Sequence, residues 1–271
     1  MGTVADTAFG VAALLYGVAG ALLLLQLSGA SAAPWVLKGG PRALLLAAAC
    51  HLAYTAAEWS ARAAGPFASL GEALSSLALL VVLAILAVGR SERRTQVVGA
   101  FVAPLVVLLL LASRVRHGHA PPHLGGAILV AHIASVTVGT AAFSVAFAMS
   151  VAYLLQERQV KKKRLGGLFQ RLPSLDVLDR VAWRSVAVGL PALTLGIVCG
   201  LFVGHRAQTS GAPVVTWQQY VALGAWALFA AVLLLRVAAG WRGRRAALGT
   251  ILGYLGAVLV LVGYLLRGDA P

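Results

Sequence analysis

Residues 126–155 read GAILVAHIASVTVGTAAFSVAFAMSVAYLL, and no aspartate, glutamate, lysine or arginine interrupts them. A helix needs about 20 apolar residues to cross the hydrocarbon core of a bilayer. This stretch is longer than that, so a spanning helix formed by it must tilt or protrude. The stretch therefore predicts a membrane-spanning helix, and this helix contains one ligand-capable side chain, His132.

The rest of the chain has the same character. Of its 271 residues, 60% are hydrophobic and 11% are charged, whereas soluble domains are about half apolar and about a quarter charged. The mean hydropathy is +0.89. Further apolar blocks of spanning length lie at residues 9–27, 43–63, 67–88, 97–112, 185–203, 220–239 and 248–266. We therefore predict an all-α fold, a polytopic transmembrane bundle of eight helices that forms a single domain over residues 1–271.

The positive charges of the chain gather on one side of this predicted bundle. Most of the 22 lysines and arginines fall near the loops after the first, third, fifth and seventh helices; the exceptions are Arg62, Arg114, Arg116, Arg206 and Arg267. Cytoplasmic loops are enriched in Lys and Arg, so both termini are expected on the outer side. The net charge of +14 then reflects topology and lipid headgroups rather than nucleic acid as a partner.

The largest predicted loop is cytoplasmic and covers residues 157–184. Ser174 is typical of a helix N-cap, and it precedes a short amphipathic segment that ends near Trp183. Leu175, Leu178 and either Val181 or Ala182 share one face of that segment. This face suggests a short helix lying in the membrane interface.

Histidines inside a membrane are rare and are functional hypotheses by default. The predicted direction of the helices places His132 and His205 near one level on the outer side. A neutral imidazole is a good ligand for haem iron, so these two residues are candidates for the axial pair of one haem. The alternative is that each is a hydrogen-bonded structural histidine.

Small side chains follow His132 along one face of the same predicted helix, at Ser135, Gly139 and Ala146, with Phe143 among them. Such a face leaves room for a flat ligand. It also suits a closely packed neighbouring helix. The sequence leaves both interpretations open.

His51 is predicted to lie deeper than the outer pair. It is a candidate for a second ligand site, or else it bonds to a neighbouring helix. Glu58 follows on the same face two turns nearer the outer side, and Arg62 has the i,i+4 spacing of an ion pair with it. These two residues are therefore expected to pair at the outer rim.

Other motifs give weaker signals. His117, His119 and His123 lie close together in one loop, but no neighbouring cysteine or carboxylate supports a metal site, so a solvated loop is favoured. Cys50 and Cys199 lie in apolar blocks and are interpreted as buried thiols rather than a disulfide. The chain has no Cys-x-x-Cys-His motif for covalent haem, no phosphate-binding glycine loop and no His-Glu-x-x-His motif.

Four stretches together resemble the cytochrome c assembly superfamily (CcsA, CcmC), and within it the HemX/YpjD-type inner membrane proteins. They are the helix from His132 to Tyr153-Leu-Leu-Gln-Glu-Arg158, the segment Arg171-Leu-Pro-Ser-Leu-Asp-Val-Leu-Asp179, the helix Gly189-Leu-Pro-Ala-Leu-Thr-Leu-Gly-Ile-Val-Cys-Gly-Leu-Phe202 that leads to His205, and the segment from Trp226 to Gly240-Trp-Arg-Gly-Arg-Arg245. Helix 43–63 with His51 also matches the HemX/YpjD arrangement.

The resemblance implies a protein that handles non-covalent haem b. It gives His132 the role of an outer axial histidine, His205 that of its partner and His51 that of a transmembrane histidine. It implies membrane lipid and haem as partners, with other cytochrome c assembly proteins or a haem-biosynthesis enzyme, and a multi-pass location in a bacterial inner membrane.

The chain departs from the synthase members of the superfamily in two places. The outer loop 206–217 is short and has one tryptophan at its end, and Leu234 stands where a histidine is common in synthases. A HemX-like role in haem handling or in regulation of haem biosynthesis therefore fits better. A haem or small-solute transporter and a membrane adaptor that holds a soluble enzyme through residues 157–184 are the alternatives. None of these functions requires catalysis by this chain.

Overall fold

A computed structural model of the chain describes residues 2–29, 33–62, 67, 69–114, 126–163, 166–208 and 217–266. Nearly all of these residues are helical, which confirms the predicted all-α class. The helices are α1 (Gly2–Ser28), α2 (Pro34–Arg62), α3 (Leu70–Ser91), the 3-10 helix η1 (Arg93–Val98), α4 (Gly99–Ala112), α5 (Ala127–Lys161), α6 (Leu168–Arg171), α7 (Leu175–Gln208), α8 (Trp217–Ala239) and α9 (Arg244–Leu266).

Seven helical segments in the described part of the chain are long and apolar enough to cross a membrane. They are α1, α3, η1 with α4, α5, α7, α8 and α9. The helix α2 has 29 residues and is not among the seven, because polar side chains such as Lys38, His51 and Glu58 lower its hydropathy. The structure thus confirms a multi-pass bundle, while the number of eight spans and the outer location of the termini stay predictions.

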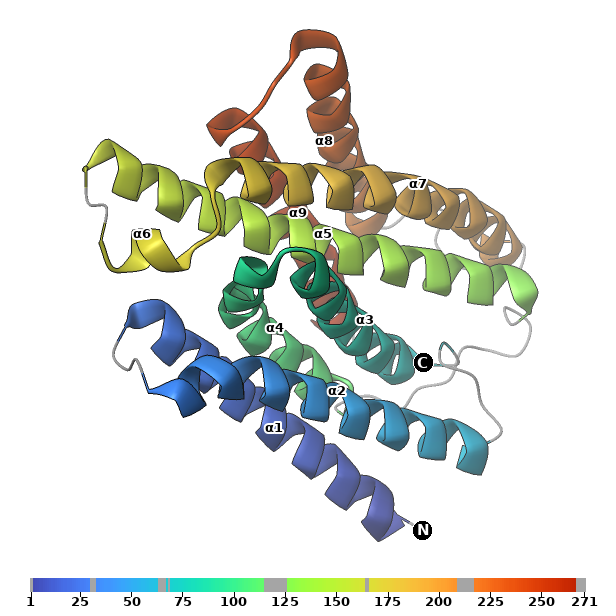
Figure 1. Cartoon of the computed structure of the whole chain (residues 1–271). Helices are drawn as coiled ribbons and strands as arrows, with labels where there is room; N and C mark the ends of the chain where they lie inside the picture. Colours follow the sequence, from blue (N-terminus) through green and yellow to red (C-terminus); the bar gives the residue numbers. More distant parts are fainter. Residues whose placement is uncertain are drawn as a thin grey trace.

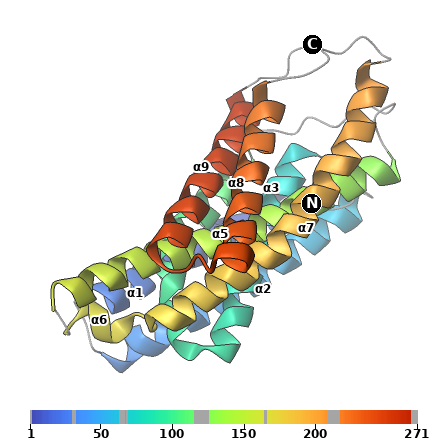
Figure 2. The same ribbon diagram turned by 90° about the horizontal axis from the view of Figure 1, so that it is seen from above.

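The long helix α5 lies at the centre of the bundle. Figure 1 shows α5 and α7 running side by side, with α1 to α4 on one side of them and with α8 and α9 crossing behind them, and Figure 2 shows the same helices from above. One apolar core joins α1 to α5 around side chains such as Leu110 and Met149. A second core lies among α5, α7, α8 and α9, where the rings of Phe143 and Phe229 stack with their centroids 3.7 Å apart.

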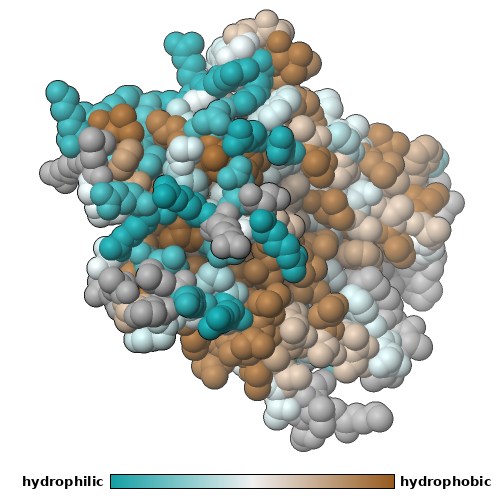
Figure 3. Space-filling view, viewed as in Figure 1, coloured by the Kyte–Doolittle hydropathy of each residue, from teal (hydrophilic) through white to brown (hydrophobic). Residues whose placement is uncertain are grey.

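Contacts between helix ends show that α1 runs opposite to α4 and that α3 runs opposite to α7. Asp6 near the start of α1 forms an ion pair of 2.9 Å with Arg114, which follows the end of α4. Arg180 near the start of α7 lies 3.3 Å from Glu92, which follows the end of α3. We call the end of the bundle that contains α6 the basic end. Figure 3 shows hydrophilic residues gathered at that end of the molecule and hydrophobic residues over much of the rest of this face.

The predicted short amphipathic helix is not a separate element. Residues 175–183 form the first turns of α7, which continues for 34 residues without a break. The Leu178 N–H donates to the carbonyl of Ser174, where the helix begins. Leu178 and Val181 are buried in the protein core rather than lying in the membrane interface. The interface prediction was wrong because α5 extends to Lys161 and offers this apolar face a protein surface to pack on.

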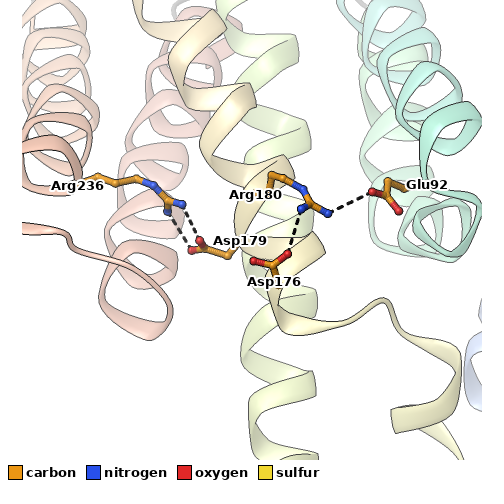
Figure 4. Close-up of polar contacts among 5 residues, drawn as sticks. All are labelled: Glu92, Asp176, Asp179, Arg180 and Arg236. Carbon is orange, nitrogen blue, oxygen red and sulfur yellow. Dashed lines mark hydrogen bonds and ion pairs between the residues drawn. The ribbon is translucent and has the colours of Figure 1, made fainter.

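Side-chain contacts fix the first turns of α7 at the basic end. The Asp179 carboxylate accepts two hydrogen bonds from Arg236 near the end of α8, at 3.0 and 2.7 Å, and one of 3.1 Å from the backbone N–H of Gly243. Gly243 lies in the turn between α8 and α9 with a φ of 70°, a backbone conformation that favours glycine. Figure 4 shows this pair beside Arg180, which bridges Asp176 and Glu92.

Candidate functional site

His132 lies near the start of α5, at the opposite end of the bundle from α6, and its ring is half-buried against α7. The Nδ1 atom of the ring is 2.7 Å from the carbonyl oxygen of Gly196. A carbonyl oxygen can only accept a hydrogen bond, so Nδ1 must carry the proton. In the neutral ring the other nitrogen, Nε2, therefore carries the lone pair that can bind a metal.

The missing side chain of Gly200 on α7 leaves the space that the His132 ring occupies. A Cβ atom at Gly200 would lie 2.8 Å from Cε1 and 2.9 Å from Nδ1 of the ring, and a Cβ at Gly196 would lie 2.7 Å from a methyl carbon of Val136. All three distances are too short for any larger residue to fit without a shift. The ring can therefore reach the Gly196 carbonyl because Gly200 has no side chain, whereas the glycine at Gly196 lets α7 approach Val136 of α5.

The small residues that follow His132 on α5 are covered by α7. A Cβ atom at Gly139 would lie 3.1 Å from the carbonyl oxygen of Gly189, and a Cβ at Gly189 would lie 2.7 Å from the ring of Phe143. Of the two interpretations left open by the sequence, the closely packed helix is the one that the structure shows. A haem bound to His132 would therefore lie outside the seam between α5 and α7.

His205 lies near the end of α7, and its side chain is exposed at the protein surface. It follows Gly200 by five residues, which in a regular helix is a rotation of about 140° and an advance of about 8 Å. His205 is therefore on a different face of α7 from the glycines that contact His132. The described arrangement does not bring the two imidazoles together, and their axial pairing stays a prediction.

His51 is fully buried between α1 and α3 (0% exposed). Its Nε2 atom is 2.9 Å from the hydroxyl oxygen of Ser75, and its Nδ1 atom is 3.2 Å from the hydroxyl oxygen of Tyr16. Both ring nitrogens thus have a hydrogen-bonding partner on a neighbouring helix. This arrangement matches the structural alternative for His51 and leaves no lone pair free for a ligand.

A polar cleft lies near His51, at the end of the bundle opposite the basic end. Glu58, Glu72 and Arg114 line it, and Ser75 forms part of its wall.

The side chain of Arg62 and the histidine loop 117–123 lie outside the described residues, so the predicted Glu58–Arg62 pair and the predicted alternative of a metal-binding loop are not tested. Among the described residues, no group of three or more His, Cys, Asp or Glu side chains is placed to hold a metal ion.

Sequence analysis identified His132 but missed the residues that hold it. The signal was present, because Gly196, Gly200 and Gly204 repeat every four residues along α7, a spacing typical of close helix packing in membranes. The hydroxyls of Tyr16 and Ser75 gave no such signal. They are 35 and 24 residues from His51 in the sequence, and only the fold brings them to it.

The fold defines a multi-pass membrane protein, and near one end of its bundle it carries a half-buried histidine whose Nδ1 atom contacts a backbone carbonyl. Residues 42–267 match the model of the cytochrome C assembly protein family. This match covers most of the chain, and the protein belongs to that family.

Cyanobacterial proteins named cytochrome c biogenesis protein CcsA are similar to this chain over most of its length. The relative from Prochlorococcus marinus is 29% identical over 275 residues, which cover 86% of this chain and 85% of the relative. The relative from Synechococcus elongatus is 29% identical over 267 residues, which cover 79% of this chain and 80% of the relative. The resemblance to the cytochrome c assembly superfamily is thereby confirmed.

Proposed function

We propose that this protein binds haem b non-covalently through Nε2 of His132 and handles haem during cytochrome c assembly. The observation that carries the proposal is the contact between Nδ1 of His132 and the Gly196 carbonyl oxygen. A histidine that binds a metal almost always donates its other ring N–H to a carbonyl or a carboxylate. This contact supports the proposal because it favours the tautomer in which Nε2 is free to bind iron.

The chemistry around His132 suits haem in two further respects. The hydrogen bond from Nδ1 makes Nε2 a stronger electron donor to iron. His132 is only half-buried, which supports an approach of a large flat ligand from outside the α5–α7 seam. When bound, haem would supply an iron atom that takes up the Nε2 lone pair, and the chain's own task is to hold and orient that nitrogen.

Membership of the cytochrome c assembly family supports a bacterial inner membrane as the location, and haem and other assembly proteins as partners.

The geometry of His205 does not favour it as the second axial ligand, so we do not include it in the proposed site. His51 is also left out, because both of its nitrogens are hydrogen-bonded. A transport route through His51 and an adaptor role for the start of α7, which is packed on the core, gain no support.

The test is an absorption spectrum of the protein purified from membranes. We expect a Soret band that disappears after extraction with acidified acetone, because haem b held only by an iron–nitrogen bond leaves the chain when the imidazole is protonated. Absence of a Soret band after expression with a sufficient haem supply would contradict haem binding. Haem that remained on the chain after extraction would contradict non-covalent binding.

A further inference from the structure

We infer that the backbone carbonyl of Gly196 and the missing side chain of Gly200 position His132, so that α7 sets the donor strength of the iron ligand carried by α5. This inference rests on the proposed haem site and adds positioning residues to it. Neither glycine would touch iron. Each would act through the imidazole ring of His132.

The Gly196 carbonyl is suited to a double role. In an α-helix, the carbonyl of a residue accepts the N–H of the residue four positions later, and a carbonyl oxygen has a second lone pair for another donor. The 2.7 Å contact with Nδ1 of His132 uses this second lone pair. A backbone acceptor has no other rotamer and cannot ionise, so it holds the ring in one orientation as long as α7 stays in register with α5.

Gly200 decides whether the ring can reach that carbonyl. A methyl group at this position would lie 2.8 Å from Cε1 and 2.9 Å from Nδ1 of the ring, so the ring would have to swing away and the hydrogen bond would break. Gly204, one turn further along the same helix, has no atom within 4 Å of where its Cβ would be. Gly204→Ala thus makes the same glycine-to-alanine change in α7 as Gly200→Ala, but the added methyl group does not contact His132.

Close packing of α5 on α7 is not by itself evidence for this role. Further along the same seam, a Cβ atom at Gly139 would meet the Gly189 carbonyl and Leu193, and neither offers a ligand-capable side chain. In the described part of this seam, the imidazole of His132 enters beside Gly196 and Gly200. The position of Gly139 therefore provides a second control, which disturbs helix packing at a distance from His132.

The experiment compares Gly200→Ala, Gly204→Ala and Gly139→Ala in the full-length protein, with haem affinity and the iron reduction potential as readouts. We expect Gly200→Ala to weaken haem binding by about 10-fold or more, as loss of a metal ligand's hydrogen-bond partner typically does. We also expect its reduction potential to rise, because a weaker imidazole donor stabilises ferric iron less. Gly204→Ala should match the wild type in both readouts, and Gly139→Ala should lower thermal stability without moving the potential.

Two results would overturn the inference. One is a Gly200→Ala protein with the affinity and potential of Gly204→Ala, and the other is a Gly139→Ala protein that shifts both readouts as far as Gly200→Ala does. His132→Ala separates this inference from the proposed function. If His132→Ala keeps its haem, the haem site itself is wrong; if it loses haem while Gly200→Ala behaves like Gly204→Ala, only the positioning role is wrong.

Discussion

The Nδ1 atom of His132 on α5 lies 2.7 Å from the carbonyl oxygen of Gly196 on α7. This contact couples the ligand-capable side chain to the longest interface of the bundle, in which two helices of 35 and 34 residues lie side by side. It also fixes the ring tautomer. The rest of the account follows from this relationship, because it distinguishes His132 from the other two histidines that the sequence placed in helices.

The first prediction separates His132 from His205. Because His205 is exposed and lies on another face of α7, we expect His205→Ala to keep its haem affinity within about 3-fold of the wild type. We expect the haem affinity of His132→Ala to fall by more than about 10-fold, because loss of a ligand's hydrogen-bond partner alone costs at least that much. Titration of each variant with haem measures both values. Equal losses in the two variants would restore the axial pair as the better description.

The second prediction concerns His51, which bonds to Tyr16 and Ser75 on two other helices. His51→Ala leaves buried hydroxyls without a partner, which costs about 1–3 kcal/mol each, so the protein should unfold at a lower temperature in detergent. Its haem spectrum should not change. Tyr16→Phe, which removes only one of the two contacts, should have a smaller effect. A His51→Ala protein that lost its haem as His132→Ala does would assign His51 to the site.

The third prediction concerns the ion pairs at the basic end. The side chains of Asp179 and Arg236 are 17% and 13% exposed, and breaking such a pair leaves a poorly solvated charge, so Asp179→Asn should cost about 3 kcal/mol of unfolding free energy. Arg180 and Glu92 are 41% and 40% exposed, so Arg180→Ala should cost less than about 1 kcal/mol. Denaturant titration in micelles measures both. Similar losses in the two variants would contradict the difference in burial as the cause.

The fourth prediction uses a small molecule in place of the missing side chain. In His132→Gly, free imidazole should restore a histidine-type haem spectrum, since it supplies the same nitrogen lone pair. Recovery should be partial, because free imidazole loses more translational and rotational freedom on binding than a tethered ring does. An absorption titration with imidazole measures the recovery, and Gly204→Ala is the control that should not respond. Failure of imidazole to change the His132→Gly spectrum would argue against iron ligation at this position.

Much of the fold was predictable from sequence because a long apolar stretch has to form a helix in order to cross a membrane. The stretch 126–155 predicted α5, and the structure extends it only to Lys161. The start of α7 was predicted less well. Residues 175–183 have the pattern of an interfacial helix, yet Leu178 is buried in the core, and the sequence could not show that α5 extends far enough to cover it.

The candidate site was predictable in part. His132 was identified because a histidine inside an apolar stretch is unusual. Its bond to Gly196 was not predictable, because a backbone carbonyl leaves no mark on the sequence and the two residues are 64 positions apart. The prediction that His205 lies near His132 rested only on the depth of the two residues in the membrane. Rotation around α7, which decides where a side chain points, depends on which residues pack against α5.

The most direct test of the account is a Soret titration of the haem-free protein with haem, carried out on the wild type and on His132→Ala. The account predicts a saturable, histidine-type Soret band at one equivalent of haem for the wild type and no saturable band for His132→Ala. Two identical titration curves would contradict it, because they would show that His132 does not bind the iron.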